Sequence, residues 1–290
     1  MAKFNYYPTS PLSELLQVRG GKVKLSDHDS AATPGYPGKG KSDAAAYTAA
    51  LVPELSDLQE MLYANSRVNP ETTPNVLVVL QGMDTSGKGG VIRHAIGCVD
   101  PQGVAIKAFK SPTKEELSHH YLWRIEKALP GRGMIGIFDR SHYEDVLIVR
   151  VDSLVPESEW SKRYAEINEW EAGLVANGTR LVKCMLNVSF DEQLKRLAAR
   201  LDNPNKYWKY NPSDLDSRSK WPAYMEAYEA ALELCSTDAA PWHIIPSDKK
   251  WYRNWAVAHL LRETLASLNL SWPEADFDVE AEKARLASGL

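Results

Sequence analysis

The fold of this chain is decided by residues 76–90, which read Val76-Leu77-Val78-Val79-Leu80-Gln81-Gly82-Met83-Asp84-Thr85-Ser86-Gly87-Lys88-Gly89-Gly90. The five apolar residues at the start predict a strand that is buried on both faces. The next residues match the first part of the phosphate-loop pattern, in which backbone N–H groups and a helix N-terminus converge on one phosphate. We therefore predict phosphate binding by Gly82, Thr85, Ser86, Gly87, Lys88, Gly89 and Gly90.

The loop departs from the standard pattern directly after Lys88. The usual residue there is Ser or Thr, whose hydroxyl binds Mg²⁺, and this chain has Gly89. Asp84 is an unusual carboxylate to place beside phosphates unless a cation lies between them. We predict that Asp84 replaces the missing hydroxyl as a Mg²⁺ ligand. The alternative is a glycine-rich turn in which Asp84 only caps the following helix.

A second apolar run, residues 134–138, ends in Asp139 and Arg140. An aspartate at the end of a buried strand is typical of a Walker B element, which emerges at the ligand-binding edge of an open α/β sheet. Asp139 is therefore our second predicted Mg²⁺ ligand, and Arg140 a clamp on a phosphate oxygen. The alternative is a surface ion pair. We reject a relay of Ser141, His142 and Asp145, because such close neighbours on one loop rarely meet in that geometry.

A basic segment lies in the second half of the chain. Residues 195–220 contain seven basic and three acidic side chains, so they carry +4 in a chain whose net charge is −4. A mobile lid at about residues 191–225 would explain this excess, because a lid excludes water and supplies cations to phosphates. The alternative is a solvated helix followed by a turn. The predicted lid contributes Arg196, Arg200, Lys206, Lys209 and Arg218.

The composition limits the possible class of protein. The 290 residues are 44% hydrophobic and 25% charged, which is typical of a globular domain. The slightly negative net charge gives no electrostatic reason to bind nucleic acid. The three cysteines are too few and too far apart for a disulfide framework or a zinc site. No apolar run approaches the roughly 20 residues of a membrane span, and the N-terminus lacks a signal-peptide pattern. We expect a cytoplasmic protein without a membrane or nucleic-acid partner.

The alternation of short apolar runs with longer helical patterns predicts an α/β fold. Further strands are expected at residues 104–109, 181–186 and 243–245, and helices near residues 88–98, 113–129, 157–176 and 191–234. Strands separated by helices indicate crossover connections and a parallel sheet of about five strands. We expect an N-terminal extension at residues 1–70, a core at 71–268 and a tail at 269–290. The extension starts loosely docked and continues as a helix at 42–66, in which Pro53 is a possible interruption.

Three motifs together resemble the polyphosphate kinase 2 family over about residues 45–268. They are Gly82-x-Asp84-x-x-Gly87-Lys88-Gly89-Gly90, Asp139-Arg140-Ser141-x-Tyr143 and Lys206-x-Trp208-Lys209-x-x-Pro212-x-Asp214-x-x-x-Arg218-x-x-Trp221. The resemblance implies a phosphate-loop kinase fold, with a five-stranded sheet sandwiched by helices and a helical lid. It also implies reversible, Mg²⁺-dependent phosphoryl transfer between inorganic polyphosphate and nucleotides, and assembly into homodimers or homotetramers.

The resemblance also implies residue roles. Asp84 and Asp139 would bind Mg²⁺, and Lys88 the phosphates. The transferring group would be stabilised by Arg140, Arg150, Arg196 and Arg200, and the polyphosphate chain would be bound by Lys107 and Lys110 together with the lid cations Lys206, Lys209 and Arg218. Many family members have Trp and Asn where this chain has His142 and Glu144. This variant resembles the branch that phosphorylates both nucleoside mono- and diphosphates, which makes Glu144 a candidate for acceptor selection.

Two other functions stay open at this point. One is an ATP-dependent kinase of a small molecule or nucleotide, and the other is a non-catalytic module that binds nucleotide or polyphosphate. The two predicted metal carboxylates argue against the second. The favoured direction, the preferred base and chain length, the main acceptor and the subunit count do not follow from the sequence.

Overall fold

The chain forms a five-stranded parallel sheet in a computed structural model that describes residues 5–289. The strand order is β2-β3-β1-β4-β5. The strands are β1 (Asn75–Gln81), β2 (Val104–Ala108), β3 (Ile135–Asp139), β4 (Thr179–Asn187) and β5 (Trp242–Pro246). Each of the five predicted apolar runs is a strand, so the predicted α/β fold with a parallel sheet is confirmed.

The central position of β1 explains its continuous apolar sequence. It pairs in parallel with β3 on one side and β4 on the other, and all of its residues are buried. In the register of the first pair, Leu80 lies opposite Asp139. The segments that follow β1 and β3 therefore start side by side at the carboxyl edge of the sheet.

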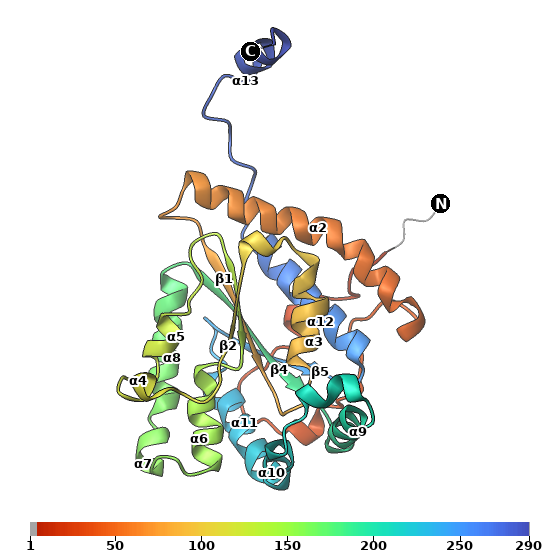
Figure 1. The fold of residues 1–290 in the computed structure, drawn as a ribbon, viewed down its shortest axis with the longest axis vertical. Coiled ribbons are helices and arrows are strands. Elements are labelled where there is room, and N and C mark those ends of the chain that lie inside the picture. Colours follow the sequence, from red (N-terminus) through yellow and green to blue (C-terminus); the bar gives the residue numbers. More distant parts are fainter. Residues whose placement is uncertain (1–4, 290) are drawn as a thin grey trace.

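Helices cover both faces of the sheet (Figure 1). Val76, Val78 and Leu80 of β1 belong to a core with α2 (Lys41–Val68) and α12 (Lys250–Ser267). Leu77 and Val79, which point the opposite way, belong to a second core with α8 (Arg163–Ala176) and α11 (Trp221–Cys235). The alternation of side chains along one strand thus builds two hydrophobic layers.

The remaining elements are short. The helices are α1 (Leu12–Leu15), α3 (Lys88–His94), α4 (Lys114–Leu117), α5 (Trp123–Glu126), α6 (Ile148–Val151), α7 (Glu157–Trp160), α9 (Phe190–Leu201), α10 (Ser213–Ser219) and α13 (Val279–Ala287). The 3-10 turns are η1 (Leu25–Asp27), η2 (Ile96–Cys98), η3 (Pro101–Gly103), η4 (His142–Val146) and η5 (Pro204–Lys209). Among the described residues, no helix is long and apolar enough to cross a membrane.

Some helix predictions need correction. The helices expected at 113–129 and 157–176 are each divided, into α4 and α5 and into α7 and α8, and the section expected at 191–234 is divided into α9, η5, α10 and α11. The helix α2 continues through Pro53, because Leu51 and Leu55 on either side are buried in the core and hold the backbone helical. Packing therefore outweighs the loss of one backbone hydrogen bond at the proline.

The N-terminal segment is irregular but firmly attached, which differs from the expectation of a loosely docked start. The carboxylate of Glu263 on α12 accepts hydrogen bonds from the backbone N–H groups of Leu12 (2.8 Å) and Ser13 (2.9 Å). Farther along, Val18 N–H donates to the carbonyl of Trp242 at 2.8 Å. An antiparallel bridge joins Gln17 to His243. The segment thus covers the edge of β5, which would otherwise expose unpaired backbone groups.

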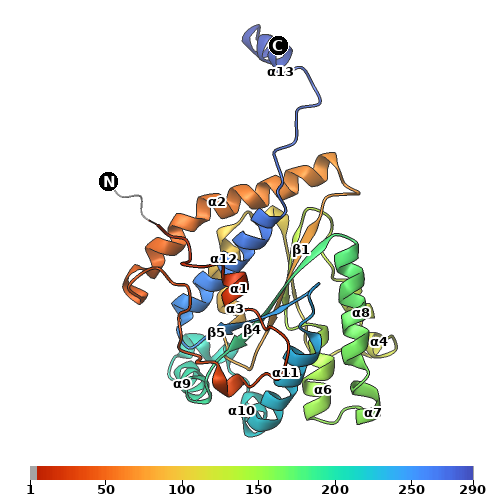
Figure 2. The same cartoon turned by 180° about the vertical axis from the view of Figure 1, so that it is seen from behind.

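The C-terminal tail leaves the body of the molecule (Figures 1 and 2). Near its start, the tail is held by a hydrogen bond from Asn65 Nδ2 to the carbonyl of Ser271 (2.8 Å). Beyond that point α13 stands apart, and Trp272, Phe277 and Leu286 are exposed. The division at residues 70 and 268 stays a prediction, although α2 shares its hydrophobic core with α12 and the sheet.

We predict that Leu12→Ala lowers the free energy of unfolding by about 2–5 kcal/mol, because Leu12 is fully buried and its truncation leaves a cavity. Leu15→Ala, on the exposed side of the same helix, is the matched control and should change it by no more than about 0.5 kcal/mol. Urea unfolding measures both variants. If Leu12→Ala lowered the free energy of unfolding no more than Leu15→Ala does, this segment would not be docked.

Candidate active site

The connection between β1 and α3 has the backbone of a tight anion-binding loop. Gly82 (φ 146°), Thr85 (φ 65°) and Gly87 (φ 112°) adopt left-handed conformations. A Cβ on Gly82 would lie 2.7 Å from the carbonyl oxygen of Leu186 on β4, so a side chain has no room there. The N-cap residue of α3 is Gly87, and no side chain caps this helix. The alternative role of Asp84 as a helix cap is therefore excluded.

Lys88 lies among the charged groups that the sequence singled out. Its Nζ donates to the carbonyl of Gly82 at 2.7 Å, which folds the side chain back over the loop. Burial and the Arg140 guanidinium lower the pKa of Lys88. Three nearby carboxylates act in the opposite direction, and they belong to Asp84, Asp139 and Glu144. The predicted site residues of the two strand ends are thus brought into one electrostatic neighbourhood.

Asp84 and Arg140 form an ion pair at 2.9 Å across the two strand ends. Arg140 has a left-handed backbone (φ 64°), and its N–H donates to the carbonyl of Leu80 on β1 (3.1 Å). The carboxylate of Glu144 is the strongest influence on Arg140 and raises its pKa, with Asp84 adding to the effect against the cost of burial. The guanidinium therefore lies between one carboxylate from the loop and one from the turn after β3.

The donor set at this edge fits Mg²⁺. Asp84 and Asp139 supply carboxylate oxygens, which are the ligands that this ion prefers. Both carboxylates raise the pKa of Lys88. Within residues 5–289, no group of three or more His, Cys, Asp or Glu side chains is arranged to hold a metal. Mg²⁺ is commonly held by one or two carboxylates together with waters and substrate phosphates, and this site offers such a partial shell.

A cavity of about 820 Å³ opens beside the turn that follows β3. Arg140 and Glu144 line one part of it, and Lys110 lines another. Apolar walls are contributed by Leu117, Ile148, Val149, Leu154 and Val155. This volume and this mixture of apolar and charged walls are typical of a site for a small organic ligand such as a nucleotide.

Of the predicted cations, only Lys110 and Arg140 are among the described residues that line this cavity, and Lys107 and Arg150 lie outside it. Lys107 is on β2, where its Nζ lies 5.8 Å from the centre of the Phe109 ring. Arg150 donates to the hydroxyl of Tyr164 (3.1 Å), and its guanidinium lies over the ring of Trp160 at 4.8 Å. Their proposed contacts with phosphate need a substrate that extends beyond the cavity.

Arg196 has a different position from the one we predicted. It is 7% exposed, and its nitrogens donate to carbonyl oxygens of Thr85 (3.0 Å) and Ser86 (3.1 Å). It also donates to the carbonyls of Ser247 (2.6 Å) and Asp248 (2.9 Å). With these bonds Arg196 holds the phosphate loop against the segment after β5, which differs from the expected contact with the transferring group.

Arg253 is a residue that the sequence analysis missed. It is 3% exposed, and its Nη1 donates to the carbonyl of Ser86 at 2.9 Å, beside Arg196. Burial lowers its pKa, and the neighbouring Arg196 lowers it further. A Cβ on Gly87 would overlap this guanidinium. The available signal was an arginine flanked by the aromatic residues Trp251, Tyr252 and Trp255, since an arginine that is buried among them needs a specific partner.

The predicted lid is anchored at its base. On α9, Gln193 Nε2 donates to the carbonyl of Asp84 (3.2 Å). Arg200 pairs with Asp214 (3.0 Å), and Arg218 donates to the carbonyl of Phe190 (2.6 Å). Arg200 and Arg218 therefore bind protein acceptors in this structure, which differs from the predicted phosphate contacts.

The outer part of the predicted lid is exposed. Lys206 and Lys209 lie on η5, and the Nζ of Lys209 is 4.8 Å from the centre of the Trp208 ring. Trp208 itself is 78% exposed. Of the phosphate-binding cations predicted in the lid, Lys206 and Lys209 on η5 are the exposed ones, whereas Arg196 of α9 packs against the phosphate loop.

The rejected relay of Ser141, His142 and Asp145 does not form. Ser141 Oγ accepts from the N–H of Tyr143, His142 lies against Glu171, and Asp145 pairs with Arg163. The three side chains thus have different partners. They therefore do not form a nucleophilic relay.

A phosphate loop at the end of a central parallel strand, with an aspartate and an arginine at the next strand end, defines a kinase of the phosphate-loop class. A model of the family described as Polyphosphate kinase 2 (PPK2) matches residues 41–271. The chain therefore belongs to this family, and the resemblance drawn from the three motifs is confirmed. By its family it is an enzyme.

Relatives agree with this assignment along most of the chain. The AMP/ADP-polyphosphate phosphotransferase of Meiothermus ruber is 47% identical over 256 residues, which is 88% of this chain and 93% of the relative. The ADP-polyphosphate phosphotransferase of Rhodopseudomonas palustris is 45% identical and covers 77% of this chain and 79% of the relative. The crystal structure of polyphosphate kinase 2 from Arthrobacter aurescens matches with a TM-score of 0.93 and 49% identity, covering 97% and 98% of the two chains.

We predict that Gly87→Ala lowers the turnover number at least about 100-fold, the scale for losing preorganised donors. The new methyl group meets the Arg253 guanidinium, and alanine disfavours the left-handed backbone of the loop. Gly173→Ala in α8 is the control, since its Cβ would contact nothing within 4 Å and alanine favours a helix. Steady-state phosphoryl-transfer rates decide, and normal turnover of the first variant would contradict the assignment of the loop.

Proposed function

We propose that this protein transfers the terminal phosphoryl group of inorganic polyphosphate to nucleoside mono- and diphosphates, reversibly converting AMP to ADP and ADP to ATP. The observation that carries this proposal is the position of Arg140. It binds Asp84 of the phosphate loop and also lines the nucleotide-sized cavity. A single guanidinium can therefore contact donor and acceptor phosphates. The name of the Meiothermus ruber relative supports the use of both AMP and ADP.

The reaction is an in-line attack by a phosphate oxygen of the nucleotide on the terminal phosphorus of polyphosphate. This oxygen is already anionic, so the site needs no strong general base. Lys88 and the loop N–H groups hold the donor, and Arg140 neutralises the charge that is shared by the two substrates. Asp84 and Asp139 would hold Mg²⁺, which would neutralise negative charge on the phosphate oxygens.

The exposed cations extend this site in the proposal. Lys107 on β2 and the lid residues Lys206 and Lys209 bind successive phosphates of the polyphosphate chain. Lys110, which the sequence assigned to the polyphosphate chain, lines the cavity, so we place it on the acceptor side instead, where Glu144 selects between nucleotides. Arg150, which lies outside the cavity, helps to stabilise the transferring phosphoryl group in this proposal. Arg200 and Arg218 join only when the lid exchanges its internal hydrogen bonds for contacts with phosphate.

Location and assembly form a further part of the proposal. All three cysteines are free thiols, which suits the reducing conditions of the cytoplasm. We propose a homodimer or homotetramer, and the exposed apolar residues Trp272 and Phe277 of the C-terminal tail support an interface between copies.

We predict that the protein forms ADP from AMP, and ATP from ADP, when it is incubated with polyphosphate and Mg²⁺ in the absence of ATP. Anion-exchange chromatography of the nucleotides measures both reactions. Chelation of Mg²⁺ with EDTA should abolish them, because the phosphate charges then lack their counter-ion. If the protein phosphorylates an acceptor only when ATP is supplied, it is an ATP-dependent kinase and the proposal is wrong.

We predict that Asp139→Asn and Lys88→Met each lower the turnover number by about 100-fold or more, the scale for losing one preorganised charge contact. Asp139→Asn should also raise the Mg²⁺ concentration needed for half-maximal rate. Asp57→Asn, at an exposed position of α2, is the charge-matched control and should leave both quantities unchanged. Near-normal turnover of a folded Asp139→Asn variant would remove Asp139 from the metal site.

A further inference from the structure

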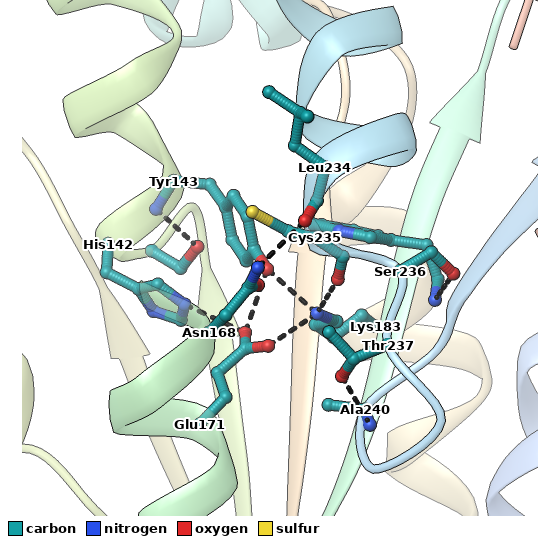
Figure 3. A network of polar contacts seen from close by, with 12 residues as sticks. His142, Tyr143, Asn168, Glu171, Lys183, Leu234, Cys235, Ser236, Thr237 and Ala240 are labelled. Carbon is teal, nitrogen blue, oxygen red and sulfur yellow. Dashed lines mark hydrogen bonds and ion pairs between the residues drawn. The ribbon is translucent and has the colours of Figure 1, made fainter. Parts of the chain in front are cut away.

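A buried charged network lies directly behind the turn that follows β3 (Figure 3). Lys183 on β4 and Glu171 on α8 form an ion pair at 2.5 Å, and both side chains are at most 1% exposed. The network also contains His142 and Tyr143 of η4 and the carbonyl oxygen of Cys235 at the end of α11. None of these groups belongs to the proposed reaction mechanism.

The partners of Lys183 and Glu171 determine their charges. Lys183 Nζ donates to Glu171 Oε2, to the hydroxyl of Tyr143 (2.8 Å) and to the carbonyl of Cys235 (2.7 Å). These three acceptors use all three protons of an ammonium group. Burial alone would raise the pKa of Glu171, but Lys183 and His142 outweigh it and hold that pKa below its usual range. The carboxylate is therefore ionised.

Glu171 in turn holds two consecutive residues of the turn. Its Oε1 accepts from the hydroxyl of Tyr143 (2.9 Å) and from Nε2 of His142 (3.1 Å). A carboxylate only accepts, so the proton of His142 lies on Nε2, and burial lowers the pKa of this histidine so that it stays neutral. Each partner of Glu171 is a donor. The carboxylate is thus the centre to which the inner side of the turn is fastened.

The outer side of the same turn carries the site. Arg140 and Glu144 line the cavity, and between them Ser141, His142 and Tyr143 are fully buried. Arg140 has a left-handed backbone, which is costly for a residue with a Cβ and persists only where the surroundings fix it. The described side-chain hydrogen bonds of His142 and Tyr143 lead to Glu171 and Lys183.

We propose that Glu171, kept ionised by Lys183, is a positioning residue for phosphoryl transfer: through His142 and Tyr143 it fixes the turn that sets Arg140 and Glu144 against the acceptor. Stability alone does not account for this pair. Replacing a buried ion pair by well-packed apolar residues is often neutral or stabilising. The network is instead suited to hold one conformation of a strained turn. The inference deepens the proposed function and depends on it.

The test uses three variants of the full-length protein. Glu171→Met with Lys183→Met removes both charges together and keeps the volume of the side chains. His142→Phe removes the hydrogen bond to Glu171 but keeps a ring beside Trp170 and Tyr143. His142→Gln restores a donor near the position of Nε2. The matched control is Glu54→Met with Arg262→Met, which removes the ion pair between α2 and α12 away from the site.

Thermal unfolding and steady-state kinetics with AMP, ADP and polyphosphate are measured for each variant. We expect the Glu171/Lys183 double variant to unfold cooperatively and to lose about 10-fold or more in kcat/KM for the nucleotide, the scale for loss of a residue that orients a site. The KM for polyphosphate should rise less than the KM for the nucleotide, because Lys88 and the loop N–H groups still hold the donor and only its contact with Arg140 is disturbed. His142→Phe should show the same pattern, and His142→Gln should recover most of the loss.

A folded double variant with wild-type kinetics for both nucleotides would overturn the inference. If the double variant does not fold, the two His142 variants decide, and equal activity of both with the wild type also overturns it. A uniform loss for nucleotide and polyphosphate, shared by the Glu54/Arg262 control, would show a purely structural role. The proposed function fails in a different way, since the wild type itself then forms no ADP from AMP and polyphosphate.

Discussion

The parallel pairing of β1 with β3 is the constraint on which the rest of the site depends. Because Leu80 lies opposite Asp139, the two segments that leave these strands begin side by side. One segment forms the phosphate loop. The other begins with Arg140, which has a left-handed backbone and whose side chain forms an ion pair with Asp84. Any shift in this register would move Asp139 and Arg140 together, away from Lys88.

Two buried arginines orient the carbonyl groups of the phosphate loop. Arg196 and Arg253 both donate to the carbonyl of Ser86, and Arg196 also donates to that of Thr85. Carbonyl groups that point toward buried guanidinium groups leave the neighbouring N–H groups free to face the opposite side. Two like charges this close are costly, so we interpret them as a means of holding the loop in the orientation that binds anions.

The sequence predicted what depends on local pattern and failed where a distant partner decides. The five strands follow from short apolar runs, although the edge strand β2 is partly exposed, and the phosphate loop follows from the spacing of Gly82, Gly87 and Lys88. The excess of basic residues singled out Arg196 as a lid cation, but it could not show that this side chain meets the phosphate loop. Arg253 lies 167 residues from its acceptor, Ser86, and no short motif marks it. Its role depends on tertiary contact alone.

The two halves of the site are built by different physical means. In the proposed function, the donor side consists of backbone groups, fixed by glycines and braced by buried arginines. The proposed acceptor side consists of charged side chains on the turn after β3, to which the ionised Glu171 is hydrogen-bonded. Backbone donors bind any phosphate of the correct geometry, whereas side chains can differ between relatives without altering the loop. Differences in acceptor nucleotide within the family should therefore arise at residues 140–144 and at the network behind them, while the phosphate loop stays the same.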